Sequence, residues 1–110
     1  MFSMIWRVEI LDETVAAEVE ALPVKVRAAL TRIVERIEQV GLERVREPHV
    51  KHLRGKLWEI RASGGETTGR ALYVTVSGKR IVIVLAFTKK SQKTPDRYID
   101  LAEQRAKGVR

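Results

Sequence analysis

The spacing of hydrophobic and polar positions along this chain predicts a small set of strands and helices. The clearest pattern is at residues 81–87, which are seven consecutive apolar residues rich in Val and Ile. A run this short and this β-branched is typical of a strand buried on both faces. A cluster of cations follows at residues 89–97. A strand buried on both faces is usually central in its sheet, so we expect a central strand whose end aims positive charge.

The first half of the chain predicts one strand and two helices. Residues 4–11 alternate between apolar and polar side chains, as in a half-buried strand. Asp12 is a suitable N-cap for a short helix at 14–22, and a second helix is predicted at 24–40. Because the two helices are so close in sequence, we expect an antiparallel hairpin that covers one side of a sheet. The apolar positions of the second helix recur at steps of four and three: Val26, Leu30, Ile33, Ile37 and Val40.

The second half predicts an ordered loop at 42–56, which shows no hydrophobic period, and then three strands. The first two strands, at 57–61 and 70–76, are joined by a flexible glycine-rich connection at 63–69. A tight hairpin turn then leads into the buried strand described above. The three strands form an antiparallel meander, and the first strand of the chain pairs with one of them.

A last helix is predicted to begin at Thr94 and Pro95, with Thr94 as the N-cap and Pro95 at the first helical position. The predicted fold class is therefore α+β, with the element order β-α-α-β-β-β-α. The N-terminal strand and helical hairpin pack on an antiparallel sheet. All 110 residues form a single domain.

Charge changes this picture more than any other feature of the composition. The chain has 21 Lys and Arg against 14 Asp and Glu, which gives a net charge of +7. Such an excess favours a polyanionic partner such as nucleic acid, although it can also serve only to keep a protein in solution. There is no cysteine, no signal-peptide pattern and no apolar run long enough to span a bilayer. We therefore expect a cytoplasmic protein without a membrane partner.

No standard catalytic motif is present, whether a phosphate-binding loop, a nucleophile motif or a spaced metal-ligand set. His49 and His52 lie three residues apart, but no third ligand accompanies them, so neither a metal site nor any other cofactor is predicted.

A cluster of cations is predicted at the place where strands of the meander end. Arg61 ends the first of these strands and Arg70 begins its antiparallel neighbour, so both lie near one end of the sheet. The third strand leaves at that same end, which adds Lys89 and Lys90. The preceding loop brings further basic residues, namely Lys51, His52, Arg54 and Lys56.

Such a cluster binds phosphate, and its like charges lower the pKa of a lysine within it. A lysine of this kind can act as the general base for an RNA 2′-hydroxyl, while arginine stabilises the charge that builds on phosphorus. The alternative for each arginine is a surface residue paired with Glu59 or Glu66. We expect Trp58 in the core rather than as a platform for base stacking, and Tyr73 to be structural. Tyr98 either packs the last helix or lends its hydroxyl to the site.

Three segments of the chain resemble the toxins of type II toxin–antitoxin modules. Their sequences are HLRGKLWEIR at residues 52–61, GRALY at 69–73 and AFTKKSQKTP at 86–95. The resemblance is to the RelE/ParE superfamily, and within it to the phage-derived HigB-like branch, and it covers nearly the whole chain. It implies a RelE-like, microbial-RNase-type fold. It also implies a ribosome-dependent mRNA endoribonuclease (mRNA interferase) that inhibits translation, whose partners are the ribosome, mRNA and a cognate antitoxin of the helix-turn-helix type.

The resemblance also implies roles for individual residues. The expected catalytic residues are Arg61, Arg70, Lys89, Lys90 and Tyr98, and the expected RNA-binding residues are Lys51, His52, Arg54, Lys56 and Lys93. Relatives often carry histidine or glycine just before the Phe of the last segment, where this chain has Ala86. Two alternatives therefore stay open, a toxin that blocks gyrase or the ribosome by binding alone, and a plain nucleic-acid-binding domain.

Overall fold

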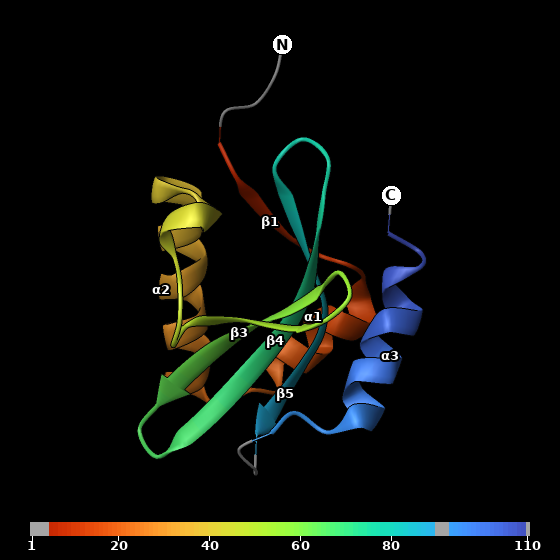
Figure 1. Cartoon of the computed structure of the whole chain (residues 1–110). Coiled ribbons are helices and arrows are strands. Elements are labelled where there is room, and N and C mark those ends of the chain that lie inside the picture. The colour runs from red at the N-terminus through yellow and green to blue at the C-terminus, as the bar shows by residue number, and fades with distance from the viewer. Residues whose placement is uncertain (1–4, 90–92, 110) are drawn as a thin grey trace.

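A five-stranded sheet with helices on both faces forms the body of the molecule (Figure 1). The computed structural model describes residues 5–89 and 93–109. The elements in chain order are β1 (Arg7–Ile10), α1 (Glu13–Glu20), α2 (Val24–Val40), the 3₁₀ helix η1 (Leu42–Arg44), β2 (Val50–Arg54), β3 (Leu57–Gly64), β4 (Thr67–Val76), β5 (Arg80–Lys89) and α3 (Asp96–Ala106). The α+β fold class is confirmed. Within the described part of the chain, no helix combines the length and apolarity needed to cross a bilayer.

The strands are ordered β1-β5-β4-β3-β2 across the sheet. β2 to β5 form an antiparallel meander, and β1 is added beside β5 in parallel orientation. The predicted buried strand is therefore an interior strand, although β4 and not β5 occupies the middle of the sheet. The predicted pairing of the N-terminal strand with a strand of the meander is also confirmed.

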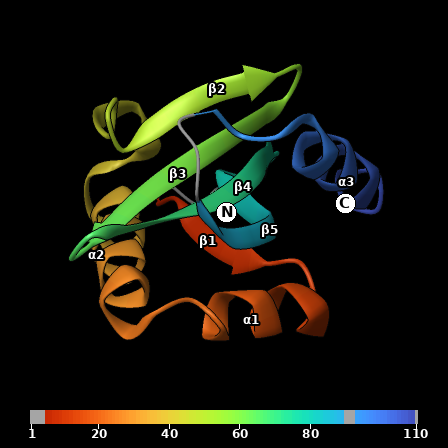
Figure 2. The same cartoon turned by 90° about the horizontal axis from the view of Figure 1, so that it is seen from below.

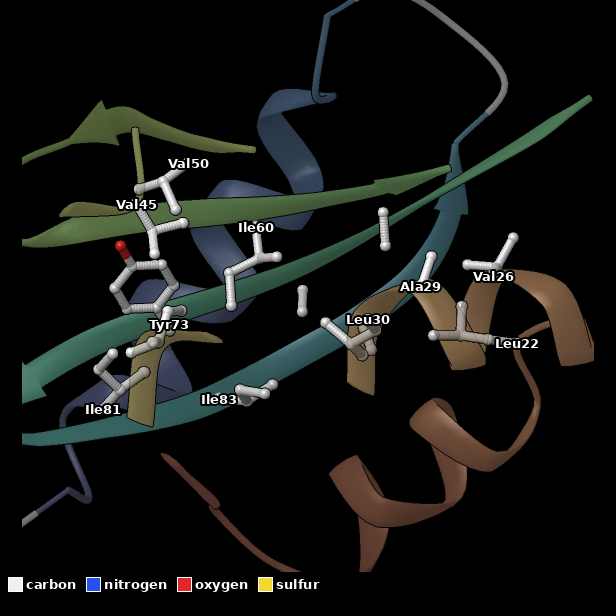
Figure 3. Packing of buried hydrophobic residues seen from close by; sticks show 14 of the residues in the cluster. Leu22, Val26, Ala29, Leu30, Val45, Val50, Ile60, Tyr73, Ile81 and Ile83 are labelled. Carbon is white, nitrogen blue, oxygen red and sulfur yellow. The ribbon is translucent and has the colours of Figure 1, made fainter. Parts of the chain in front are cut away.

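α2 and α3 lie on opposite sides of the sheet (Figure 2), and Val15 of α1 belongs to the same core cluster as the buried residues of α2. The larger hydrophobic cluster lies under α1 and α2, where Tyr73, Ile60 and Leu30 pack together (Figure 3). A second cluster under α3 includes Leu72 and Ile99. Tyr73 is structural, as predicted, and burial raises the pKa of its hydroxyl above the usual range.

The local signals in the first half of the chain predict its helices well. The backbone N–H of Val15 donates a hydrogen bond of 3.0 Å to Oδ1 of Asp12, which is the predicted N-cap of α1. Along α2, Val26, Leu30 and Ile37 are buried, as their spacing predicts. The prediction for Trp58 is wrong, because its side chain is 38% exposed.

The loop predicted at 42–56 is wrong in part, because it contains η1 and β2. β2 is an edge strand in which only Val50 is buried, so its sequence carries no alternating apolar pattern. Pairing of its backbone with β3 makes it a strand. The result is one more strand than the pattern alone predicts.

The connection predicted at 63–69 is mostly strand, because β3 and β4 both extend into it and leave only a short turn. A Cβ atom at Gly64 would lie 2.3 Å from the carbonyl carbon of Lys25, and one at Gly69 would lie 2.4 Å from Cγ1 of Val26. These glycines therefore let the start of α2 approach the sheet closely, and they do not serve flexibility.

Candidate active site

A cleft of about 680 Å³ opens at the end of the sheet where the β3–β4 hairpin meets the end of β5. The strands line it with Arg61, Ser63, Thr68, Arg70 and Lys89. The remaining lining residues are Ala29, Arg32 and Ile33 of α2, Pro48 and His49 before β2, and Glu66 in the hairpin turn. Arginine and lysine thus outnumber the single carboxylate of the lining, so the cleft suits an anion.

The strand register explains why the cations meet. Arg61 pairs directly with Arg70 across β3 and β4, and Thr68 pairs with Lys89 across β4 and β5. Directly paired residues project from the same face of a sheet, as do residues two apart on one strand. Arg61, Arg70 and Lys89 therefore share the face that α3 partly covers. Lys90 lies outside the described residues.

A buried carboxylate, Glu59, holds the two arginines. Its side chain is fully buried, and Arg70 is only 3% exposed. Nη1 of Arg70 and Nε of Arg61 both donate to Oε2 of Glu59, the second over 2.9 Å. The Thr94 hydroxyl donates to Oε1 of Glu59 over 2.7 Å and accepts from Nη1 of Arg70 over 3.0 Å. We call these four residues, Glu59, Arg61, Arg70 and Thr94, the Glu59 cluster.

The surroundings of Glu59 act on its pKa in opposite directions. Burial raises the pKa of this carboxyl, while the hydrogen bonds from Arg70, Thr94 and Arg61 lower it and outweigh the burial. The pKa of Glu59 therefore lies below its usual range, and the side chain is a fixed anion within the sheet. The alternative in which the arginines pair with Glu59 is correct, but the pair with Arg70 is buried and not on the surface.

The Glu59 cluster also corrects the expected N-cap of the last helix. Pro95 occupies the N-cap position of α3, and no side-chain hydrogen bond caps this helix. Thr94 is buried and its hydroxyl is engaged with Glu59 and Arg70, so it is not available to the helix N-terminus. The residue types at the start of α3 predict a side-chain cap, but the Thr94 hydroxyl binds Glu59 and Arg70 instead.

The cations of the cleft differ in what they offer a ligand. Arg61 is 28% exposed and is bonded through Nε, while its two terminal nitrogens make no bond within the described part of the chain. Lys89 is half-buried and has no ion pair among residues 5–89 and 93–109. Arg70 offers a ligand mainly its positive charge from below the cleft surface, because its side chain is buried and hydrogen-bonded to Glu59 and Thr94.

Tyr98, expected among the catalytic residues, lies beside the cluster and does not line the cleft. Its ring stacks on Phe87 with 4.3 Å between centroids, and Phe87 pairs with Arg70 across β4 and β5. The guanidinium carbon of Arg97 lies 5.0 Å from the centre of the Tyr98 ring. Tyr98 therefore packs α3 against the sheet next to the arginines.

The expected RNA-binding residues of β2 divide between the two faces of the sheet. Lys51 is exposed and pairs with Glu59 across β2 and β3, which places it on the same face as the Glu59 cluster. His52 pairs with Trp58 and lies on the other face, where their rings meet edge to face with 4.9 Å between centroids. Nε2 of His52 also lies 2.8 Å from the carbonyl oxygen of Gly55.

The other expected RNA-binding residues lie outside the cleft. Arg54 donates from Nη2 to Asp100 over 2.5 Å and to Glu103 over 2.6 Å, so it ties β2 to α3. Lys56 lines a separate, more apolar cleft between the sheet and α3. Lys93 is exposed and immediately precedes Thr94.

Sequence reasoning misses two residues of the cleft wall, His49 and Arg32. The backbone carbonyl of His49 accepts a hydrogen bond of 2.8 Å from the N–H of Arg61, so the chain before β2 continues along the edge of β3. That pairing follows from β2, which the hydrophobic pattern does not predict. Arg32 lies beside Ile33 at the border of the apolar stripe of α2, and helical periodicity marks it only as a solvent-facing residue. No group of three potential metal ligands occurs among the described residues.

Comparison with solved structures defines the class of fold. A chain in the crystal structure described as an archaeal RelE–RelB complex from Pyrococcus horikoshii OT3 is similar to this one, with a TM-score of 0.54 and 25% sequence identity. The similarity covers 76% of this chain and 94% of that chain. The expected RelE-like fold is thus confirmed.

A family model matches residues 17–107, and it is described as phage-derived protein Gp49-like (DUF891). Because the match covers most of the sequence, the chain belongs to this family. No curated protein sequence matches it.

Proposed function

We propose that this chain is the toxin of a type II toxin–antitoxin module, of the HigB-like branch, and that it cleaves mRNA on the ribosome. The main support is the cleft in which Arg61, Arg70 and Lys89 share one face of the sheet. The RelE-like fold and the phage-derived family agree with this function.

Cleavage of RNA by its own 2′-hydroxyl requires that negative charge be stabilised on the phosphorus as the oxygen attacks. The two terminal nitrogens of Arg61 supply a fork that matches two phosphate oxygens. Arg70 adds a fixed positive charge beneath them, since Glu59 and Thr94 hold it in place. Charges fixed before the substrate arrives need no reorganisation during the reaction, so they favour the transition state.

Proton transfer also needs a base for the 2′-hydroxyl and an acid for the departing 5′-oxygen. Lys89 and His49 are the cleft residues, within the described part of the chain, whose side-chain nitrogens suit these tasks. We assign the base role to Lys89, which lies on the same face as the two arginines, and the acid role to His49, which lines the same cleft just before β2. Lys51 extends the cationic face along β2 and would contact the RNA backbone.

The same cleft supplies a docking surface for an antitoxin. An acidic segment of the antitoxin would neutralise Arg61 and Lys89 and exclude RNA from the cleft. The similar chain comes from a complex described as RelE–RelB, which supports a partner of this class. We propose that the antitoxin carries a helix-turn-helix domain.

Induction of the chain without antitoxin in a bacterial host tests this function, with primer extension on translated mRNAs as the readout. We expect growth arrest and new 5′ ends within coding regions. Arg61→Ala and Lys89→Ala should each reduce cleavage by roughly 10²-fold, because each removes charge stabilisation or proton transfer. Arg36→Ala is the matched control, since Arg36 is exposed on α2 and does not line the cleft.

Other outcomes would identify a different function. Growth arrest with intact transcripts would contradict the nuclease and favour a toxin that blocks its target by binding. Absence of arrest, together with strongly salt-dependent binding to free nucleic acid, would favour a plain nucleic-acid-binding domain.

A further inference from the structure

We infer that Glu59 is a positioning residue of this site, and that its hydrogen bond with Thr94 anchors the start of α3 beside Arg61 and Arg70. The inference rests on the proposed function for its catalytic consequence, but the anchor itself is a property of the fold. Nothing in the similarity to other proteins assigns a role to either residue.

The contacts of Glu59 join parts of the chain that are far apart in sequence. Glu59 lies on β3, Arg70 lies on β4, and Thr94 lies after β5, 35 residues from Glu59. Each of the three lies in the interior, with exposures of 0%, 3% and 3%. Side chains buried this deeply and hydrogen-bonded to one another are held in one geometry, because water has little access to compete for their hydrogen bonds.

Glu59 cannot itself serve as the base of the reaction. Both carboxylate oxygens accept hydrogen bonds, Oε1 from Thr94 and Oε2 from the two arginines, and no surface of the side chain reaches solvent. Any effect of Glu59 on RNA must therefore pass through Arg61, Arg70 or Thr94.

The Thr94 contact has a consequence that the arginine contacts do not have. Thr94 lies two residues before Asp96, the first residue of α3, so its hydrogen bond to Glu59 ties the start of this helix to β3. Glu59 also accepts from Arg61 and Arg70, so one carboxylate holds both the arginines and the start of α3. The Thr94 hydroxyl thus sets where the start of α3 lies relative to the arginines of the cleft.

Thr94 is also bonded to Arg70, so its hydroxyl closes a ring of three side chains. It donates to Glu59 and accepts from Nη1 of Arg70, which in turn donates to Glu59. Removal of the hydroxyl would leave one acceptor on Glu59 and one donor on Arg70 without this partner. The guanidinium of Arg70 and the start of α3 would then both be held less firmly.

Thr94→Val and Thr94→Ser form the matched pair that tests this inference. Val keeps the shape of Thr and removes the hydroxyl, whereas Ser keeps the hydroxyl. In single-turnover cleavage of mRNA within ribosome complexes, Thr94→Val should lower the rate at saturating toxin by about tenfold, because small misplacements of catalytic groups slow reactions strongly. The toxin concentration that gives half of that rate should change by less than about threefold, and Thr94→Ser should resemble wild type in both.

A second measurement is independent of catalysis. Backbone hydrogen exchange of the intact protein should be faster in the first turn of α3 in Thr94→Val, by about tenfold or more, and unchanged in α2. Binding of a 2′-deoxy oligonucleotide, which the proposed reaction cannot cleave, should change by less than about threefold in both variants, because neither removes a charge from the cleft.

The two readouts separate failure of the anchor from failure of the proposed function. If wild type does not cleave RNA, the nuclease proposal fails, while hydrogen exchange in the first turn of α3 still decides the anchor. If wild type cleaves and Thr94→Val matches it in rate and in exchange, the anchor is wrong. Equal losses in Thr94→Ser and Thr94→Val would likewise overturn the role of the hydroxyl.

Discussion

Arg61 and Arg70 are direct partners in the register between β3 and β4, and both donate to the same oxygen of Glu59. Like charges placed opposite each other on neighbouring strands repel, so this pairing is unfavourable by itself. The buried carboxylate offsets the repulsion and fixes both guanidinium groups, and the cluster keeps a net positive charge next to the cleft. Structure and function therefore depend on the same three side chains.

Loss of the Glu59 carboxylate should destabilise the fold strongly. Glu59→Ala would leave Arg70, which is 3% exposed, as a buried charge without its main acceptor. Breaking a buried ion pair from one side costs about 3 to 5 kcal/mol. Urea unfolding measures this loss. Glu35→Ala is the control, since Glu35 is exposed on α2 and should change stability by less than about 0.5 kcal/mol. A loss below about 1 kcal/mol for Glu59→Ala would contradict the buried pairing.

Stability should also fall on acidification through Glu59. Its pKa in the folded protein lies below the usual value of 4.5, because the hydrogen bonds from Arg70, Thr94 and Arg61 outweigh burial. A depressed carboxyl pKa contributes stability above the unfolded pKa, and this contribution is lost as the pH falls through the folded pKa. Glu59→Gln cannot titrate at this position. The difference in unfolding free energy between wild type and Glu59→Gln should therefore shrink as the pH is lowered below about 4.5.

Urea titrations of both proteins between about pH 3 and pH 7 measure this difference. A gap that stays constant or widens on acidification would show that Glu59 is not held as an anion.

Elements with a strong hydrophobic period were predictable from the sequence. The stepped apolar residues of α2 and the unbroken run at 81–87 each bury most of their side chains, so burial and pattern agree. β2 was not predictable, because an edge strand is specified by backbone pairing and has a single buried residue, Val50. The glycines at 63–69 were misinterpreted for a similar reason, since the sequence does not show that α2 packs against Gly64.

The candidate site was also predictable in part: its cations follow from the strand order, but the buried carboxylate that holds them does not. Strand order alone brings Arg61, Arg70 and Lys89 to one end of the sheet, and the structure has them there. The role of Glu59 was missed, because a carboxylate on a strand is ordinarily solvated, and its partners here come from β4 and from Thr94, which are distant in sequence. One signal was available: Glu59 shares a face with Leu57, and that face must be covered by the last helix.

Close packing between α2 and the β3–β4 hairpin predicts that Gly64 tolerates no side chain. In Gly64→Ala the new Cβ would lie 2.3 Å from the carbonyl carbon of Lys25, which is backbone and cannot rotate away. Overpacking of this kind typically costs about 1 to 3 kcal/mol, and α2 would have to shift. Gly108→Ala is the matched control, because its nearest atom would be a carbonyl oxygen 3.6 Å away. Thermal unfolding compares the two variants, and equal melting temperatures would contradict the close approach.

Arg54 and Lys51 lie on the same strand but should differ in their contribution to RNA binding. Arg54 is bonded to Asp100 and Glu103 of α3, so its charge is already compensated. Lys51 is exposed on the face of the Glu59 cluster and has no ion pair within the described part of the chain. Lys51→Ala should weaken oligonucleotide binding for all sequences and lower the salt slope by about one, as expected for one lost phosphate contact.

Arg54→Ala should change the affinity by less than about twofold and leave the salt slope as it is. Titration of a 2′-deoxy oligonucleotide at several salt concentrations measures both variants against wild type. Circular dichroism confirms that α3 stays folded in Arg54→Ala, because that substitution removes its link to β2. If Arg54→Ala lowers the slope and Lys51→Ala does not, RNA follows the surface around Arg54 and α3 and not the cleft that Arg61 and Lys89 line.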